Sequence, residues 1–444
     1  MERDKKPTII IMNQGCIKEC AKNDYLLKKL NVYDVSVVEK IRKADYFLYI
    51  TCAGLGEEIE EFLESAPILD KLSQEQDIEI IITGCVATYF GNRIKGFLEG
   101  LGKNPKIKII EGKDWVFPVV NYITGANEVK KVEDEMAMRT LFKDRDSVYI
   151  QFMMEEGCTN RCSFCKMNYI DKPITSVDFD IALKYLTAMV KEKGTKQITL
   201  DGENLTIYGI DLYGRQRLHE FLHELAKIEG LERIQVQEIV AGNMYSELLD
   251  ELANNPKVKT VCLQLETASN RLLKLMNRNY TIEEYDYCVR RLKDAGKFVT
   301  TIIMSSFPTE RYRDIYETFK YIKERGIYVY DVAKYSDFPG MIPSSKLKQF
   351  RKWAAMRRYM LTSRGVTINN FRFLSRERFR QGRLIYTIAR EGNPVFLGDM
   401  LNAMVYPKTE RFNDLTPGTI IDEAPSGIFI KKTPDERRLS YKID

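Results

Sequence analysis

The sequence predicts an α/β protein that begins with a doubly wound parallel sheet and ends in a small β-rich domain. Near the N-terminus, short apolar runs rich in β-branched and aromatic residues occupy positions 8–13, 46–51 and 79–84. Helical patterns such as Asp24–Leu30 and Glu57–Leu63 separate these runs. Strands that alternate with helices favour a parallel sheet covered by helices on both faces.

The C-terminal part of the chain has a different pattern. Beyond about residue 367, short strand-like segments are separated by Gly, Pro and Asn turns. These segments are Leu384–Ile388, Ala403–Tyr406, Gly418–Ile421 and Gly427–Lys431. This composition is typical of a small β-barrel.

Length and composition indicate a cytoplasmic enzyme. The 444 residues are enough for two or three domains, and 44% hydrophobic with 30% charged residues is close to the globular average. No signal peptide precedes the first strand, and no apolar run approaches the roughly 18 residues of a membrane span. We therefore expect no membrane partner, and nine cysteines that serve metal or redox chemistry rather than disulfides.

Three cysteines, Cys158, Cys162 and Cys165, form a C-x3-C-x2-C loop. Iron–sulfur clusters are normally held by four thiolates, so three would leave one iron of a 4Fe–4S cluster open to a substrate, as in catalytic zinc sites. A zinc knuckle or buried structural thiols are the alternatives. A zinc knuckle needs a fourth ligand nearby, and the only histidines are His219 and His223. The spacing resembles that of the radical S-adenosylmethionine (SAM) enzymes, whose free iron chelates SAM.

A second group of cysteines follows the three N-terminal strands: Cys16, Cys52 and Cys85. The carboxyl ends of the strands in a doubly wound sheet share one edge, where ligands bind. We therefore expect these cysteines to converge in space. Buried structural thiols are the alternative, since cysteine is readily buried.

Both cysteine groups together resemble the methylthiotransferase branch of the radical SAM superfamily. The supporting stretches are Thr-Cys-Ala at 51–53, Thr-Gly-Cys-Val-Ala at 83–87, Leu-Asp-Gly-Glu-Asn-Leu-Thr-Ile-Tyr-Gly at 200–209, Leu272–Tyr280, and Tyr335-Ser336 with Gly340. The stretch at 272–280 matches the family's Leu-Lys-x-Met-Asn-Arg-x-Tyr almost residue for residue. The resemblance covers about residues 8–345.

The resemblance implies a domain plan and a chemistry. An N-terminal domain, 1–140, would hold an auxiliary 4Fe–4S cluster through its three cysteines. A partial TIM-type (β/α)6 barrel, 145–345, would carry the SAM cluster, and residues 346–444 would form a basic helix and the β-rich domain. Such enzymes cleave SAM with a low-potential electron to a 5′-deoxyadenosyl radical, deliver sulfur from the auxiliary cluster and take a methyl group from a second SAM.

The first auxiliary ligand has two candidates, Cys16 and Cys20. Cys16 follows its strand directly, as Cys52 and Cys85 follow theirs, and we choose it. Cys20 lies within the start of the next helix and is a possible spare or persulfide carrier. Cys262 and Cys288 have apolar contexts and are expected to be structural.

The resemblance also outlines a SAM site but names no catalytic residue. Phe164 would lie against the adenine, Gly202 and Glu203 would end the second barrel strand beside the methionine amino group, and Glu266 and Thr267 would end a later strand. The family usually has Gln at the position of Glu266, and Arg at the position of Phe338. These departures leave the SAM chemistry intact but obscure the substrate.

The run His219-Glu-Phe-Leu-His223 matches the H-E-x-x-H pattern of zinc proteases. The stretch Leu218–Leu231 has the apolar spacing of an amphipathic helix, and no third ligand is identifiable. We therefore interpret the run as part of an outer helix of the barrel.

The prediction of the substrate depends on the distribution of charge. Between Lys346 and Arg390 there are thirteen basic residues with interleaved aromatics and one acid, Glu377. Such a stripe is typical of proteins that bind a phosphate backbone, although a solvated helix is the alternative. The leading hypothesis is a modified adenosine in tRNA. A polypeptide substrate, either a ribosomal protein or a precursor peptide, is the first alternative, and a non-enzymatic iron–sulfur or RNA-binding protein is the second.

Overall fold

The computed structural model describes residues 6–14, 17–53, 56–89, 95–143, 149–168, 172–305, 307, 309–335, 405–407 and 428–430. The chain divides into two compact units. The first is built chiefly from Met1–Phe142 and the second chiefly from Ile174–Tyr335.

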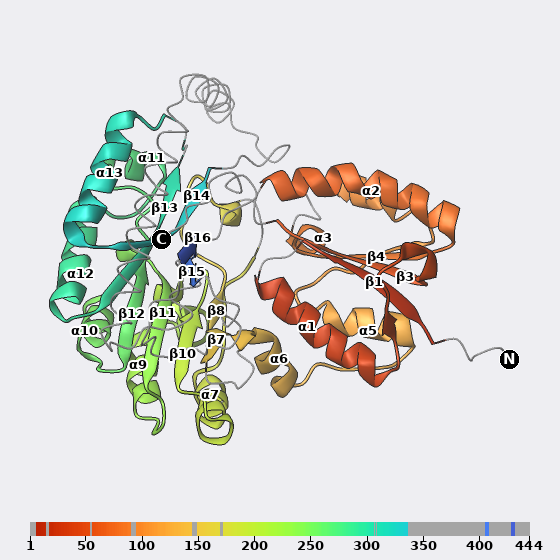
Figure 1. Cartoon of the computed structure of the whole chain (residues 1–444), viewed down its shortest axis with the longest axis horizontal. Helices are drawn as coiled ribbons and strands as arrows, with labels where there is room; N and C mark the ends of the chain where they lie inside the picture. The colour runs from red at the N-terminus through yellow and green to blue at the C-terminus, as the bar shows by residue number, and fades with distance from the viewer. Residues whose placement is uncertain are drawn as a thin grey trace. The chain divides into compact units, whose positions relative to one another are not determined.

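The N-terminal unit is a parallel sheet with helices on both faces (Figure 1). Its strands are β1 (Thr8–Asn13), β2 (Ser36–Val37), β3 (Tyr46–Thr51), β4 (Glu79–Gly84) and β5 (Ile107–Ile109), in the order β2-β1-β3-β4-β5. The helical segments are α1 (Ile17–Val32), η1 (Ile41–Lys43), α2 (Gly56–Gln76), α3 (Cys85–Tyr89), α4 (Lys95–Leu101), α5 (Val116–Thr124) and α6 (Val132–Arg139), followed by strand β6 (Thr140–Lys143). This strand order has its switch point between β1 and β3, where open α/β sheets bind ligands.

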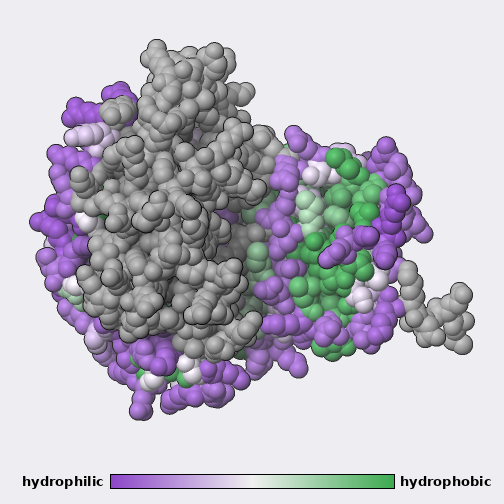
Figure 2. Space-filling model, viewed as in Figure 1, coloured by the Kyte–Doolittle hydropathy of each residue, from purple (hydrophilic) through white to green (hydrophobic). Residues whose placement is uncertain are grey.

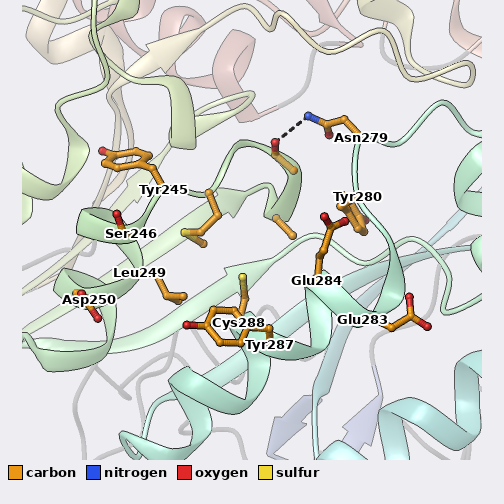
Figure 3. A pocket seen from close by; sticks show the side chains of 13 residues that line it. Tyr245, Ser246, Leu249, Asp250, Asn279, Tyr280, Glu283, Glu284, Tyr287 and Cys288 are labelled. Atoms are coloured by element: carbon orange, nitrogen blue, oxygen red, sulfur yellow. Dashed lines mark hydrogen bonds between the residues drawn. The ribbon is translucent and has the colours of Figure 1, made fainter.

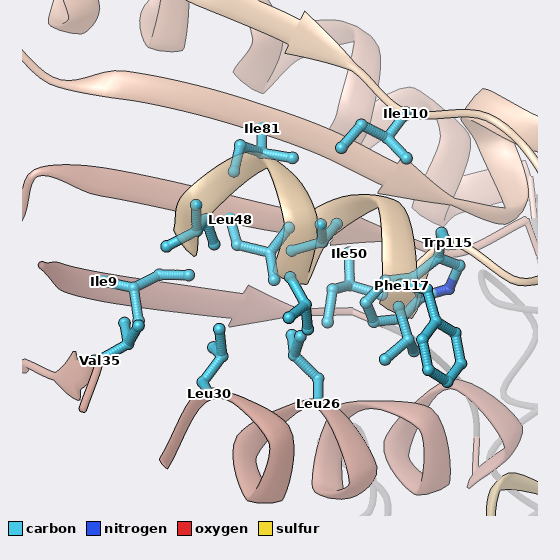
Figure 4. Packing of buried hydrophobic residues seen from close by; sticks show 14 of the residues in the cluster. Ile9, Leu26, Leu30, Val35, Leu48, Ile50, Ile81, Ile110, Trp115 and Phe117 are labelled. Atoms are coloured by element: carbon cyan, nitrogen blue, oxygen red, sulfur yellow. The ribbon is translucent and has the colours of Figure 1, made fainter. Parts of the chain in front are cut away.

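The strands predicted at 8–13, 46–51 and 79–84 coincide with β1, β3 and β4. They are correct because each run is a continuous β-branched and aromatic stretch, which is typical of strands buried on both faces. One face of the sheet packs on α1 and α5 (Figure 4). Ile9, Leu26 and Leu48 are fully buried there. Burying an aliphatic side chain of this kind contributes about 1.5–3 kcal/mol.

The second unit alternates strands and helices in the manner of a partial barrel (Figure 1). Its parallel strands are β7 (Tyr149–Met153), β10 (Gln197–Asp201), β11 (Arg233–Ile239), β12 (Val258–Leu263), β13 (Phe298–Ser305) and β14 (Tyr328–Lys334). The sheet has the order β14-β13-β12-β11-β10-β7-β6, with β6 as an edge strand. The longer helices between them are α7 (Phe179–Lys193), α9 (Leu218–Ala226), α10 (Ser246–Asn254), α12 (Ile282–Asp294) and α13 (Tyr312–Arg325). The predicted α/β class with a partial barrel is confirmed.

Several short strands and helices lie in the loops that follow these strands. They are β8 (Glu155–Glu156) and β9 (Thr175–Ser176), which pair antiparallel, with η2 (Lys166–Asn168), η3 (Leu205–Ile207), α8 (Ile210–Tyr213), η4 (Ala241–Asn243) and α11 (Asn270–Leu275). The outer helices are amphipathic. Leu222 and Leu252 are fully buried, whereas the coloured rim of this unit in Figure 2 is mostly hydrophilic.

Little of the C-terminal region is among the described residues. Strands β15 (Val405–Pro407) and β16 (Ile428–Ile430) pair antiparallel, with Tyr406 opposite Phe429. They overlap two predicted strands, those at 403–406 and 427–431. The other two predicted strands and the basic segment 346–390 lie outside the described residues.

Candidate functional site

The C-x3-C-x2-C loop follows the first strand of the barrel. β7 and β8 lead into Gly157, whose φ of 97° lies in the left-handed region. Glycine adopts this conformation without steric cost, so the chain can turn sharply just before Cys158. The Gly157 amide donates to a carboxylate oxygen of Glu203 at 2.7 Å. Farther along the loop, the Cys165 amide donates to the Cys162 carbonyl at 3.0 Å.

The sulfur of Cys158 lies among amide donors. The Asn160 backbone amide and the Asn204 side-chain amide approach Sγ at 3.4 and 3.5 Å. Asn243 holds both partners, because its Oδ1 accepts from Asn160 Nδ2 at 2.9 Å and from Asn204 Nδ2 at 3.1 Å. Hydrogen bonds to sulfur tune the potential of iron–sulfur clusters. This donor set therefore fits a cluster-ligating thiolate.

Glu155 organises the end of the second barrel strand. Its side chain is fully buried, and its Oε2 accepts from the backbone amides of Glu203 at 3.1 Å and Asn204 at 3.0 Å. A Cβ on Gly202 would come within 2.9 Å of the same oxygen. A larger residue at 202 would therefore push against the Glu155 carboxylate, which holds the Gly202-Glu203 turn against the start of the cysteine loop.

Glu266 and Thr267 end the strand β12 segment in a strained turn. Glu266 has a φ of 61°, and its carboxylate forms an ion pair with Arg278 at 3.1 Å, with both side chains almost fully buried. Tyr280 donates to the carbonyls of Gln264 and Leu265 at 2.9 and 3.0 Å. Burying two charges is costly, and breaking such a pair would leave one buried charge without its partner, so Glu266 and Arg278 hold each other and this turn in place.

The Thr267 hydroxyl lies 3.1 Å from the hydroxyl of Thr318 on α13. It also accepts from the Ser269 amide at 3.2 Å. These contacts give Thr267 a positioning role in the turn. Phe164, between two of the loop cysteines, is half-buried.

In the N-terminal unit, Cys52 and Cys85 follow neighbouring strand ends. β3 and β4 pair in parallel with Thr51 opposite Gly84, so the two cysteines come one residue later on adjacent strands. Gly84 has a φ of 94°, and a Cβ there would lie 2.4 Å from the Thr51 carbonyl oxygen. The close approach of the two strand ends therefore requires glycine at this position.

The Thr51 hydroxyl ties the same strand ends together. It donates to the Thr83 carbonyl at 2.6 Å and accepts from the Val86 amide at 3.2 Å. Cys52 is buried and Cys85 is half-buried. Cys16 lies outside the described residues, and the adjacent strand β1 ends shortly before it.

Cys20 lies on α1, as predicted, and is exposed. Its sulfur is 3.7 Å from the Asn13 side-chain amide at the end of β1. Cys262 and Cys288 are buried, in agreement with their expected structural character.

Known proteins match most of this chain. The model of the radical SAM superfamily matches residues 154–322. The ribosomal protein uS12 methylthiotransferase RimO of Clostridium perfringens (strain ATCC 13124) is 27% identical over 80% of this chain and 82% of its own length. The RimO of Acetivibrio thermocellus is 26% identical over 74% of this chain and 78% of its own length. The chain therefore carries a radical SAM domain and is similar over most of its length to radical SAM methylthiotransferases.

The radical SAM domain and these relatives identify the protein as a radical SAM transferase that uses SAM and 4Fe–4S clusters, of which methylthiotransferases carry two. Among solved structures, the radical SAM methyltransferase TsrM of Kitasatospora setae aligns with a TM-score of 0.46 and 12% identity, over 73% of this chain and 75% of that one.

Within the part of the chain that the structure describes, every helix is too short or too polar to span a membrane.

The H-E-x-x-H run lies on an outer helix of the barrel, as predicted. α9 buries Leu218, Phe221 and Leu222. His219 Nδ1 pairs with the Tyr245 hydroxyl at 3.0 Å, whereas His223 Nδ1 lies 3.7 Å from Glu251 Oε2. The helix ends at Ala226, earlier than the sequence pattern suggested, although Ile228 and Leu231 remain buried.

Sequence reasoning missed several residues that organise the site. Their common feature is a polar side chain that hydrogen-bonds or pairs beside the cysteine loop or the strand ends, and they are Glu155, Asn160, Asn204, Asn243 and Arg278. Signals existed for three of them: Glu155 precedes the cysteines, Asn204 follows the Gly-Glu pair, and Arg278 lies in the Met-Asn-Arg stretch.

Proposed function

We propose that this enzyme inserts sulfur and a methyl group at an unactivated C–H bond of a polypeptide, namely a ribosomal protein. The observation that carries the proposal is the similarity to ribosomal protein uS12 methylthiotransferases over 73–80% of the chain. The alternative tRNA substrate rests on the basic segment 346–390, which lies outside the described residues. We therefore place the polypeptide first.

We further propose that Cys158, Cys162 and Cys165 hold the cluster that receives SAM. Such a cluster, when bound, supplies the electron that splits SAM into methionine and a carbon radical. The protein's part is to hold the first thiolate in place. Asn160 and Asn204 donate to Cys158, and Asn243 keeps both donors oriented.

Cys16, Cys52 and Cys85 are our proposed ligands of the auxiliary cluster. Support comes from the parallel register that sets Cys52 beside Cys85 and from the close strand approach that Gly84 permits. Cys16 follows β1, the neighbour of β3 in the sheet. Cys20 is the rival for the third position.

SAM itself is assigned to the carboxyl ends of the barrel strands. In this proposal Phe164 contacts the adenine, Gly202 and Glu203 approach the methionine amino group, and Glu266 and Thr267 border the ribose side. The fixed turn at Glu155 supports the second assignment, and the buried pair of Glu266 with Arg278 supports the third.

The remaining proposals follow from these. The domains are 1–140 for the auxiliary cluster, 145–345 for radical formation and 346–444 for a basic helix with a small β-rich domain. A low-potential electron donor is the expected redox partner, because reductive SAM cleavage needs one. A ribosomal protein substrate supports a cytoplasmic location.

The test compares cells that lack the protein with cells that express either the wild type or a Cys158→Ala variant. Intact-mass spectrometry of the ribosomal proteins should reveal one species that gains a methylthio group only with the wild type. Nucleoside analysis of tRNA from the same cells tests the rival. A methylthio nucleoside that depends on Cys158, together with unchanged ribosomal proteins, would reverse the choice of substrate.

A further inference from the structure

A pocket lies on the outer side of the barrel, between η4 and the first turns of α10 and α12 (Figure 3). Its volume is about 640 Å³. The residues that line it and carry the argument are Gly242, Tyr245, Asp250, Glu283, Tyr287 and Cys288. A cavity of this size is within the range of ligand sites in proteins.

The walls of the pocket are held by specific contacts. Asn279 Nδ2 donates to the Gly242 carbonyl at 2.9 Å, and a Cβ on Gly242 would collide with the Asn279 side chain. Tyr245 is oriented by its contact with His219 at 3.0 Å. Glu284 accepts from the Thr281 amide at 2.7 Å in a capping box at the start of α12. These contacts fix the shape of the pocket within the fold.

The polar groups of the lining carry negative charge. Asp250, Glu283 and Glu284 contribute carboxylates, and the residues that line the pocket include no Lys, Arg or His. Asp250 is paired with Arg291 behind the lining at 3.2 Å, so Glu283 and Glu284 carry most of the negative charge that a ligand would meet. A hydrogen bond from Asn270 lowers the pKa of Glu283 below its usual value, so this carboxylate is ionised at neutral pH. An anionic ligand would be repelled.

Neutral groups complete the pocket. Tyr245, Tyr280 and Tyr287 present aromatic surface, and Tyr287 is 61% exposed at the rim. Cys288 is only 5% exposed, and its thiol points into the pocket (Figure 3). Burial raises the pKa of this thiol to about 11, so it stays protonated and can donate a weak hydrogen bond.

We propose that this pocket binds a basic side chain, an arginine or a lysine, of the polypeptide substrate. Carboxylates form strong charge-assisted hydrogen bonds with guanidinium and ammonium groups, and tyrosine rings attract the same cations through their faces. The volume also leaves room for the backbone next to that side chain. The inference rests on the proposed polypeptide substrate and specifies one of its recognition elements.

The short helix η4 connects the pocket to the cysteine loop of the radical SAM domain. η4 lines the pocket through Ala241 and Gly242, and its last residue, Asn243, binds Asn160 and Asn204 at 2.9 and 3.1 Å. Asn204 in turn contacts the Cys158 sulfur. A substrate anchored here would be held beside the loop of the SAM cluster.

The test measures peptide binding by the full-length, cluster-loaded protein under anaerobic conditions. The probe is a fluorescein-labelled Gly-Arg-Arg-Gly amide, and its control contains citrulline, which has the shape of arginine without its charge. The double variant Glu283→Gln/Tyr287→Ala alters two exposed pocket residues. Glu192→Gln, at an exposed position of α7, removes the same charge elsewhere. Thermal melts verify that each variant is folded.

We expect saturable binding of the arginine peptide, with affinity roughly tenfold lower for the citrulline peptide and for the double variant. Glu192→Gln should bind like the wild type. Absence of saturable binding, or binding that the double variant retains in full, would overturn the inference. If the double variant is unstable, Glu283→Gln alone provides the comparison of charge.

The outcome separates this inference from the proposed function. Methylthiolation of a ribosomal protein together with peptide binding that ignores the pocket variants would refute the pocket alone. Pocket-dependent binding of the arginine peptide without any thiolated polypeptide in cells would refute the proposed function instead.

Discussion

At the scale of single residues, Glu155 is the side chain that holds the Gly202–Asn204 turn in place beside the cysteine loop. It is fully buried and accepts from two backbone amides that would otherwise lack an acceptor in a buried turn. Leaving buried donors unsatisfied costs about 1–3 kcal/mol for each group. The carboxylate thus holds the Gly202–Asn204 turn in the place where we assign SAM.

Glu155→Ala should therefore lower the free energy of unfolding of the barrel by about 2–3 kcal/mol. It should also slow reductive SAM cleavage, because the turn would lose its support. Glu155→Gln keeps one acceptor oxygen and should retain most of both properties. Urea unfolding and the rate of 5′-deoxyadenosine formation measure the two effects. Equal behaviour of the Ala and Gln variants would argue against this role.

The hydrogen bond from Asn204 to Cys158 leads to a separate prediction. Asn204→Ala removes one N–H···S contact and frees Asn243 from one of its partners. Loss of such outer contacts typically costs roughly 10- to 100-fold in metal affinity or activity. We expect a more negative reduction potential for the cluster of this loop, measured by redox titration. An unchanged potential with normal iron content would contradict the assignment of Cys158 as a ligand supported by Asn204.

Site residues could be predicted from the sequence where they belong to a short local motif. The loop cysteines and the Gly202-Glu203 pair belong to short recognisable stretches. Glu155 is close to the loop in the sequence, but its role, like the roles of Asn160 and Asn243, could not be predicted because it depends on contacts across the barrel. A buried carboxylate that accepts backbone amides has no sequence signature of its own.

At the scale of elements, the ends of β3 and β4 form the frame for Cys52 and Cys85. Gly84→Ala would place a Cβ against the Thr51 backbone and impose a left-handed conformation on an alanine. Such strain costs about 1–3 kcal/mol and would separate the strand ends. Gly100→Ala, in a helix with nothing within 4 Å of the new Cβ, is the matched control.

We expect Gly84→Ala to lose the iron of the auxiliary site and to retain SAM cleavage. Gly100→Ala should behave like the wild type in both respects. Iron analysis and 5′-deoxyadenosine assays give the readout. Full iron content in Gly84→Ala would mean that the two strand ends do not frame a cluster.

The joint between α11 and α13 is the second element of interest. Asp314 is buried and accepts from the Ser269 hydroxyl at 2.7 Å, the Arg311 amide at 2.7 Å and Arg271. Burial would raise the pKa of Asp314, but these hydrogen bonds lower it below its ordinary value overall. The joint fixes the segment that follows Glu266 and Thr267.

The depressed pKa makes this joint sensitive to acid. The stabilisation is present above the pKa of an unfolded aspartate, about 3.9, and is lost as the pH falls through the lower folded value. Asp314→Asn should destabilise the protein by about 1–3 kcal/mol at neutral pH and should weaken the loss of stability below about pH 4. Asp294→Asn, at an exposed position on α12, controls for the general effect of charge. Parallel stability curves for Asp314→Asn and the wild type would refute this role.

Helices and strands with a clear hydrophobic pattern were predicted accurately, and those with an ambiguous pattern were predicted less well. The strands at 8–13, 46–51 and 79–84 were correct to the residue, since buried parallel strands are continuous apolar runs. The helix from Leu218 ended earlier than its apolar spacing suggested. Its spacing continues into a turn because Ile228 and Leu231 are also buried.

At the scale of the whole molecule, two groups of three cysteines imply a specific metal content. After anaerobic reconstitution we expect about eight irons per chain. Replacing Cys158, Cys162 and Cys165 by Ala should remove half, and replacing Cys16, Cys52 and Cys85 should remove the other half. A wild-type plateau at about four irons would end the two-cluster account. Full iron in Cys16→Ala alone would transfer that ligand role to Cys20.

Fold class, family and cofactors followed from the sequence because they depend on cysteine spacing and strand order. The substrate did not. The basic segment 346–390 favoured tRNA, whereas the similarity to uS12 methylthiotransferases favours a polypeptide. Charge alone could not decide, because a basic surface binds any acidic partner.

The central claim is that radical formation and sulfur delivery belong to different cysteine groups of one chain. The most direct measurement supplies SAM, a strong reductant and the ribosomal protein identified in cells to the Cys16/Cys52/Cys85 triple Ala variant. The account predicts continued formation of 5′-deoxyadenosine and no methylthiolated product. A methylthiolated product from this variant, or loss of SAM cleavage while the remaining cluster is spectroscopically intact, would contradict it.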